Sequence, residues 1–283
     1  MAERKNMISE VTDTDCAAHQ QFLERMSQMR IIKKWRIRMD IQKNRWHEVW
    51  EHRVENEAIL KSENPREIFM ELKRINGWDS TGSMLKYDQF YDQYVQTKNE
   101  LEFSPRSKSN VISSVFEVGC GCGANLYLFQ NDGYHVGGMD YSIHMIGIAG
   151  RVLANPIELI CEEAANLSWE VKYDAVLSNS VFSYFDSYEY AKKTLEAMYN
   201  KANQSIGIID IHNIEKEKEF IQFRKGLYQN YEERYRGLPK FFYEKSFFLD
   251  FAEKHNMSIK FTKPDMKDYW NNEFVFNCFM RKR

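Results

Sequence analysis

A short apolar run leads directly into three glycines at alternate positions in the segment Val115-Phe-Glu-Val-Gly-Cys-Gly-Cys-Gly123. This pattern predicts a buried strand, a tight turn and then a helix over Asn125–Gln130. Because glycine has no Cβ, the backbone of such a turn can approach a ligand closely, and the N-terminus of the following helix offers free N–H groups. The segment therefore predicts a ligand-binding loop at the carboxyl end of a strand.

Strands and helices alternate after this loop. The expected strands are Tyr134–Met139, Ile157–Cys161, Tyr173–Leu177 and Ser205–Ile211, and the expected helices are Ile143–Leu153 and Tyr188–Asn200. A further helix over Lys245–Lys254 precedes an extended Met257–Phe261 and a strand over Phe274–Met280. The alternation predicts an α/β, Rossmann-like, doubly wound sheet that is mostly parallel and covered by helices on both faces.

Two acidic residues indicate what the loop binds. Asp140 lies seventeen residues after Gly123, at the end of the second expected strand, where a carboxylate can accept hydrogen bonds from both hydroxyls of a ribose. Glu117 lies inside the first strand, and the loop has no basic residue that could meet a pyrophosphate. We therefore expect an adenosyl compound that carries an amino acid, rather than NAD.

The loop closely resembles the first motif of class I S-adenosylmethionine-dependent methyltransferases. Three later segments follow in the order of that family: Asp140-Tyr-Ser142, Glu162-Glu-Ala-Ala-Asn-Leu-Ser-Trp169 and Tyr173-Asp-Ala-Val-Leu-Ser-Asn-Ser-Val-Phe182. Ser168 replaces the family's usual proline, and Ser183 and Tyr184 stand where two histidines are common. The resemblance covers about residues 110–283. It implies an enzyme that transfers a methyl group from S-adenosylmethionine, with S-adenosylhomocysteine as product, and a last strand antiparallel to the others.

The resemblance also implies a set of cofactor-binding residues. The methionine part of the cofactor would lie against Gly119, Gly121 and Gly123, with Glu117 helping to hold its ammonium group. Asp140 would bind the ribose, and the adenine would meet Tyr141, Met145, Glu163 and Ala164. Ser178 and Asn179 would lie near the sulfonium.

Catalytic and acceptor-binding residues are less strongly indicated. A general base is needed only where the acceptor must lose a proton, and the candidates are Tyr184, Asp210 and His212. Each of them also has a plain structural interpretation, since residues at strand ends are commonly hydrogen-bonded or cap a helix. The aromatic residues that we expect to line the acceptor site are Tyr87, Tyr91, Tyr94, Tyr184 and Tyr243. Cys120 and Cys122 are interpreted as packing residues, and no metal is expected.

We expect residues 1–105 to form a helical extension and residues 106–283 to form the methyltransferase domain, with a substrate-covering insertion at about residues 214–244. The extension would act as a lid, shape the acceptor site or mediate formation of a homodimer. Its segment 25–53 carries nine Lys or Arg against three acids, which is either a solvated face or a docking surface for an anionic partner. Asn64, Pro65 and Glu67 predict the start of a helix.

Composition narrows the choice of acceptor. Lys plus Arg number 39 against 41 for Asp plus Glu, and this near-balance argues against a nucleic-acid partner. No apolar run approaches a membrane span, and the 5 cysteines lack the spacing of a disulfide framework, so we expect a cytoplasmic protein with reduced thiols. A small-molecule acceptor is expected, while O-, N- and C-methylation stay undecided. Two alternatives remain: an RNA or protein substrate docked on the basic segment, and a non-enzymatic sensor or scaffold that only binds the cofactor.

Overall fold

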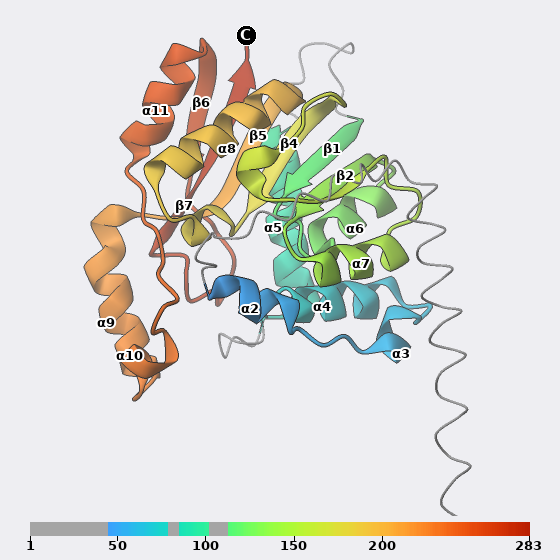
Figure 1. The fold of residues 1–283 in the computed structure, drawn as a ribbon, viewed down its shortest axis with the longest axis horizontal. Coiled ribbons are helices and arrows are strands. Elements are labelled where there is room, and N and C mark those ends of the chain that lie inside the picture. The colour runs from blue at the N-terminus through green and yellow to red at the C-terminus, as the bar shows by residue number, and fades with distance from the viewer. Residues whose placement is uncertain (1–44, 79–84, 102–112) are drawn as a thin grey trace, which may run out of the picture.

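A seven-stranded sheet forms the centre of the computed structural model, which describes residues 45–78, 85–101 and 113–283 (Figure 1). The strands are β1 Ser114–Val118, β2 His135–Asp140, β3 Leu159–Cys161, β4 Tyr173–Asn179, β5 Ala202–His212, β6 Met257–Thr262 and β7 Val275–Lys282, in the spatial order β3-β2-β1-β4-β5-β7-β6. Neighbours from β3 to β5 pair in parallel, whereas β7 is antiparallel to both β5 and β6. The predicted Rossmann-like sheet with an antiparallel last strand is confirmed.

The direction of winding reverses between β1 and β4. Val115 of β1 pairs with Val136 of β2 on one side and with Ala175 of β4 on the other. In open α/β sheets ligands bind beyond the carboxyl ends of the strands at such a switch point. The glycine-rich loop, residues 119–123, follows β1 at this place.

Helices cover both faces of the sheet. Those from the second half of the chain are α6 Ala124–Asn131, α7 Ile143–Val152, α8 Tyr188–Lys201, α9 Glu217–Leu227, α10 Tyr231–Arg234 and α11 Lys245–Lys254, with 3-10 turns η2 Ala164–Asn166, η3 Phe182–Tyr184 and η4 Ile214–Lys216. Those before the sheet are α2 Trp46–Glu51, α3 Glu57–Leu60, α4 Pro65–Ile75 and α5 Tyr87–Leu101. One buried cluster packs helices α4, α5, α6 and α7 against Val115 and Leu177 of the sheet. A second cluster packs α8 and α11 against Phe116 and Val176. None of the described helices is long and apolar enough to cross a membrane.

The start of α4 follows the predicted capping pattern with one change. Asn64 caps the helix by accepting the N–H of Arg66, and Pro65 occupies its first position. The carboxylate of Glu67 accepts from the side chain of Asn64 and from Ser62, while the backbone N–H of Asn64 donates to Ser62. Because the cap fixes the residue at which the helix begins, it also fixes which side chains face the sheet. These are the apolar residues of α4.

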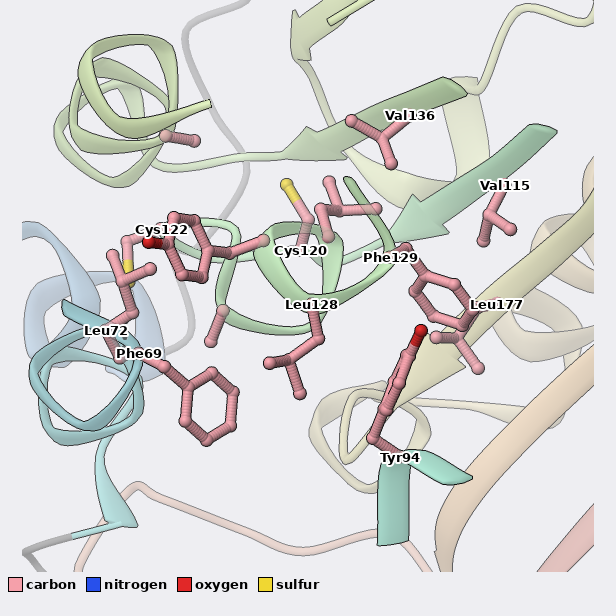
Figure 2. Close-up of a cluster of buried hydrophobic side chains, with 14 of the residues drawn as sticks. Phe69, Leu72, Tyr94, Val115, Cys120, Cys122, Leu128, Phe129, Val136 and Leu177 are labelled. Atoms are coloured by element: carbon pink, nitrogen blue, oxygen red, sulfur yellow. Dashed lines mark hydrogen bonds between the residues drawn. The ribbon is translucent and has the colours of Figure 1, made fainter. Parts of the chain in front are cut away.

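The apolar face of α4 places its end beside the glycine-rich loop. Phe69 and Leu72 are buried in the first cluster, where Figure 2 shows Leu72 near Cys122 of the loop. Burying two such side chains contributes roughly 1.5–3 kcal/mol each, which is enough to hold the helix in place. Helix α4 is therefore part of the same packed unit as the sheet.

Two expectations concern residues outside those that the structure describes. The predicted domain boundary at residue 105 lies in the segment 102–112, and residues 25–44 of the basic segment lie in the segment 1–44. The expected insertion at about residues 214–244 contains η4, α9 and α10. In Figure 1 these helices extend beyond the sheet on the side where α2 and α4 lie.

Candidate functional site

The glycine-rich loop turns through backbone conformations that favour glycine. Gly119, Gly121 and Gly123 have φ angles of +71°, +55° and +84°. A Cβ at Gly119 would lie 2.3 Å from Cγ2 of Val181, and one at Gly121 would lie 2.3 Å from Oδ1 of Asn76. Both glycines are therefore required by the conformation and by the close approach of neighbouring elements.

Asp140 ties this loop to the end of β2. Its Oδ2 accepts the N–H of Gly121 at 2.9 Å, and its Oδ1 accepts the N–H of Ser142 at 3.0 Å. Burial raises the pKa of Asp140 to about 6, although these two backbone donors oppose the rise. The carboxylate thus holds the loop and the following turn at fixed positions, and it lies where the sequence predicts the ribose.

Glu117 supplies an unsatisfied carboxylate oxygen beneath the loop. The side chain is 2% exposed, and Oε1 accepts from Nδ2 of Asn125 at 2.6 Å. Oε2 is buried and has no hydrogen-bond partner among the described residues. Burial raises the pKa of Glu117 to about 8. A buried carboxylate oxygen without a donor fits the ammonium group of an amino-acid ligand, because an ammonium group has three donors and no acceptor.

The residues expected around the adenine meet a side chain from α2. The ring of His47 stacks on Tyr141 at 4.0 Å between centroids, and its Nε2 lies 3.6 Å from Oε1 of Glu163. Glu163 also accepts from the hydroxyl of Tyr190, and Ala164 begins η2 directly after it. Met145 is buried on α7. The structure thus brings together Tyr141, Glu163 and a histidine that the sequence analysis missed.

Asn76 is a second missed residue of the site. Its Oδ1 accepts the N–H of Cys122 at 3.0 Å, so the end of α4 is bonded to the glycine-rich loop. The thiol of Cys122 contacts the same oxygen and the carbonyl of Leu72, which agrees with the interpretation of Cys122 as a packing residue. The dipeptide Asn76-Gly77 signals the end of a helix in the sequence, but no local pattern indicates its contact with the loop.

A second polar cluster lies at the carboxyl ends of β4 and β5. Asp210 is 5% exposed, and its Oδ2 accepts from the hydroxyl of Tyr269 at 2.5 Å and from Ser180 at 2.9 Å. Its Oδ1 is buried without a partner among the described residues. Ser180 in turn bonds Asn179, while Ser178 is fully buried on β4. This cluster joins Asn179, one of the two expected sulfonium neighbours, to one expected base, whereas the hydroxyl of Ser178 has no hydrogen-bond partner among the described residues.

An irregular stretch of β5 turns the side chain of Asp210 into this cluster. The pairing of β5 with β7 shifts register between Ile208 and Ile211, and Asp210 has a φ angle of +60°. Its N–H donates to Oδ1 of Asn277. Side chains of a regular strand point alternately to its two faces, and a bulge of this kind turns one side chain away from that pattern. Burial raises the pKa of Asp210, and the bonds from Tyr269 and Ser180 oppose that rise.

The other two candidate bases have surroundings that suit them less to proton transfer. His212 packs against Phe220 and Phe242, and burial holds its pKa well below the usual range. Burial raises the pKa of Tyr184, which therefore keeps its proton near neutral pH. The Nζ of Lys240 lies 3.4 Å above the ring of Tyr184. Tyr269 was not predicted, because nothing in the loop before β7 distinguishes it from other aromatic residues.

Tyr94 and Tyr243, which were expected to line the acceptor site, make structural contacts. Tyr94 donates to Asp132, which follows the last turn of α6, so it lies a helix length of about 12 Å from the glycine-rich loop. Tyr243 is fully buried in the second cluster and donates to the carbonyl of Phe182. Both hydroxyls have structural partners.

Tyr87 and Tyr91 also lie away from the loop. Their rings stack on each other, and Arg66 lies over Tyr87 at the first turn of α4. That turn is about 15 Å along the helix from Asn76. Among the five expected tyrosines, only Tyr184 lies beside the polar cluster of β4 and β5.

Comparison with known proteins agrees with this geometry. Residues 115–203 match the family model of a methyltransferase domain. A search among curated proteins finds no relative of the chain.

Solved structures share the fold. A magnesium protoporphyrin IX methyltransferase from Synechocystis, with bound S-adenosylhomocysteine, is 16% identical and has a TM-score of 0.51 over 70% of this chain and 84% of that one. An S-adenosylmethionine-dependent methyltransferase from Clostridium acetobutylicum is 13% identical, with a TM-score of 0.50 over 70% and 92% of the two chains. The plantazolicin methyltransferase is 15% identical, with a TM-score of 0.50 over 85% and 100%.

The family match covers the elements that carry the predicted motifs, from β1 with its glycine-rich loop through β4. The strand order and the single reversed strand β7 complete the same architecture. The chain thus carries a methyltransferase domain at residues 115–203, within the sheet order expected of class I S-adenosylmethionine-dependent methyltransferases.

Proposed function

We propose that this enzyme methylates a small molecule. The observation that carries the proposal is the enclosure of Asp210, which is 5% exposed and bonded to Tyr269 beneath the loop before β7. Trp46 and Trp50 of α2 pack against the nearby Tyr184. A reactive group so deeply covered favours an acceptor small enough to be enclosed. The protoporphyrin methyltransferase with the same fold is likewise named for a small molecule.

S-adenosylmethionine, when bound, supplies a methyl group on a positively charged sulfur. In our proposal Glu117 holds the ammonium group, the glycine-rich loop contacts the methionine part and Asp140 holds the ribose. Tyr141, Met145, Glu163 and Ala164 surround the adenine, and Ser178 and Asn179 lie near the sulfur. These residues fix the position of the electrophile, so the remaining tasks are to orient the acceptor, exclude water and accept a proton where one is lost.

The helix α2 would act as the lid over both ligands. The backbone carbonyl of Trp46 accepts from the hydroxyl of Tyr141 on the cofactor side, and its indole N–H donates to the carbonyl of Pro239 on the acceptor side. His47 stacks on Tyr141, where the adenine is expected, so either His47 moves aside or it contacts the adenine when the cofactor binds. A lid that touches both halves favours this role for the extension over dimerisation.

The alternative of an RNA or protein substrate finds less support. Of the basic residues in the segment 25–53, the structure describes Arg45 and Arg53. Arg45 donates to the carbonyl of Arg236, and Arg53 donates to the carbonyls of Ile75 and Arg74. The guanidinium group of Arg53 is therefore used inside the protein, whereas the side chain of Arg45 is 54% exposed.

The function is tested by supplying cofactor with an isotopically labelled methyl group together with three separate acceptor pools. These are a deproteinised extract of small metabolites, total RNA and denatured cellular protein. We expect label in the small-molecule pool, and none with the Asp140→Ala variant. Label in RNA or protein would contradict the proposal, and cofactor binding without label in any pool would support the sensor or scaffold.

The pKa of Glu117 predicts how cofactor binding depends on pH. Burial raises that pKa to about 8, so the carboxyl is protonated in the free protein at pH 6. Because an ammonium group favours the ionised form, binding must release this proton at pH values below about 8. We expect the affinity for S-adenosylhomocysteine to rise between pH 6 and pH 8, by up to about tenfold per pH unit.

Calorimetric titration at pH 6, 7 and 8 measures this dependence. The Glu117→Gln variant has no carboxyl group at this position, so it should bind weakly and show only the pH dependence of the ligand itself. The Glu170→Gln variant, which changes an exposed glutamate outside the site, should behave like the parent enzyme. Equal pH profiles for the parent enzyme and Glu117→Gln would show that Glu117 does not hold the ammonium group.

A further inference from the structure

Arg224 of α9 is a buried cation without an anionic partner among the residues that the structure describes. The side chain is 6% exposed, and its Nη1 has no hydrogen-bond partner among the described residues. Its guanidinium group donates to the hydroxyl of Tyr235, and no carboxylate of the described part of the chain lies within 4.0 Å of it. Buried arginines are normally paired, because an isolated buried charge is costly. The described part of the chain therefore does not supply the anion that a buried arginine normally has.

Aromatic rings surround the guanidinium group. Its central carbon lies 4.9 Å from the centroid of Tyr228, 5.0 Å from that of Tyr235 and 4.9 Å from that of Trp270. Arginine stacked on aromatic rings keeps its in-plane N–H donors available for a planar anion such as a carboxylate. The indole N–H of Trp270 is also buried without a partner among the described residues. Nη1 of Arg224 and the indole N–H of Trp270 can thus each still donate a hydrogen bond, and the two side chains are in contact.

This aromatic arrangement adjoins the cluster around Asp210. Trp270 follows Tyr269, which donates to Asp210, and Phe220, one turn before Arg224 on α9, packs against both His212 and Trp270. Lys240 is a second basic side chain near this cluster, and burial holds its pKa well below the usual range. Its Nζ donates to Ser183 at 3.2 Å, and no carboxylate of the described residues lies within 4.0 Å of it.

Arg224, Lys240 and Asp210 interact electrostatically across this region. Arg224 and Lys240 are close enough to His212 to lower its pKa further, after the larger effect of burial. Asp210 is the acid that acts on Lys240, and Lys73 also lies within electrostatic reach of Asp210. Burial lowers the pKa of Lys73 and holds that of Lys240 well below its usual range, so Arg224 is the cation that a neutral acceptor would leave uncompensated. An anionic acceptor would compensate Arg224 and would favour the charged form of Lys240.

We infer that the methyl acceptor is an acidic small molecule whose carboxylate or phosphate group binds Arg224, with its apolar body against the neighbouring aromatic rings. This inference rests on the proposed function and names the class of its substrate. Arg224 then orients the acceptor from the insertion, while Asp210 lies at the ends of the strands where the methyl group is transferred.

The test uses benzoate and phenyl phosphate as anionic probes, with benzamide as the neutral analogue of benzoate. Binding to the full chain is measured by calorimetry in the presence of saturating S-adenosylhomocysteine. We expect at least one anion to bind and benzamide to bind at least tenfold more weakly. Arg224→Gln should weaken anion binding at least tenfold, and Arg224→Lys should restore part of it.

Arg234→Gln is the matched control. Arg234 lies in α10 of the same insertion, is exposed and also contacts the ring of Tyr228, at 4.5 Å. It should keep anion binding within about twofold of the parent enzyme. Equal binding of benzoate and benzamide, absence of anion binding, or equal losses in Arg224→Gln and Arg234→Gln would overturn the inference.

Two further measurements separate other causes of failure. If Arg224 is an uncompensated charge kept for a ligand, Arg224→Met should unfold in urea at a midpoint no lower than that of the parent enzyme. A large drop in that midpoint would show that the aromatic arrangement is structural, which contradicts the inference. Titration with S-adenosylhomocysteine alone reports on the cofactor site, so a failure of the proposed function is recognised separately.

Discussion

Replacing Asp140 by alanine is expected to weaken the binding of S-adenosylmethionine by roughly a hundredfold or more. A hydrogen bond to a charged group contributes about 1.5–3 kcal/mol, so the loss of two ribose hydroxyls predicts about 3–6 kcal/mol. The variant also loses the bonds from the N–H groups of Gly121 and Ser142, which position the loop. Both effects act in the same direction. Calorimetric titration with the cofactor and its product measures them together.

Two further variants show whether the loss is specific. Asp140→Asn keeps one acceptor oxygen for the backbone and should bind with an intermediate affinity. Asp174→Ala is a matched control, because Asp174 also accepts backbone N–H groups, those of Ser113 and Ser114, but does so at the amino ends of the strands. It should lower stability without changing cofactor affinity. If Asp140→Ala binds the cofactor with an affinity within a factor of three of the parent value, Asp140 does not bind the ribose.

The parts of the fold that were predictable from sequence are those encoded by local patterns. Apolar runs predicted the strands, and the spacing of the glycines predicted the loop. Few other local structures fit an apolar run that is followed by alternate glycines. Asp140 was predictable for the same reason, because it directly ends the second strand. The cap of α4 at Asn64 followed from three neighbouring residues. Each of these features depends on residues that are close in sequence.

The residues that were missed act through contacts between distant segments. Asn76 bonds Cys122 across 46 positions, and Tyr269 bonds Asp210 across 59. His47 reaches Tyr141 from α2, far earlier in the chain. Such pairs depend on how α2, α4 and the loop before β7 pack against the sheet, and no spacing rule in one segment describes that packing.

The surroundings of the α5 tyrosines could not be predicted from sequence for a related reason. An aromatic residue near a site and one in a core have the same local pattern, so position in the chain was the only guide. Tyr94 packs against Phe129 and donates to Asp132, which uses its ring and its hydroxyl for structure. For Asp210, by contrast, the sequence placed a carboxylate at a strand end, and the bulge that exposes it to Tyr269 became visible only in three dimensions.

Asp210→Asn is expected to lower kcat by roughly 10²–10⁴ with the acceptor that the labelling experiment identifies, because positioned general bases contribute rate factors of that size. Asparagine is nearly isosteric and tolerates the positive φ angle of this position, so the bulge should survive. Cofactor affinity should stay within about threefold of the parent value. A fall in kcat of less than tenfold would mean that the acceptor reacts through a free lone pair and needs no base.

The pH profile distinguishes a base from a residue that only shapes the site. As the base, Asp210 must be ionised, so kcat should rise with pH through its pKa, which burial raises above the usual value for aspartate. The hydroxyl of Tyr269 donates to this carboxylate at 2.5 Å and stabilises the ionised form. Tyr269→Phe removes that donor, so the acid limb of the profile should move to higher pH, while kcat on the plateau changes less than in Asp210→Asn. An acid limb that stays in place in Tyr269→Phe would separate the rate from the ionisation of Asp210 and leave the carboxylate with a purely structural role.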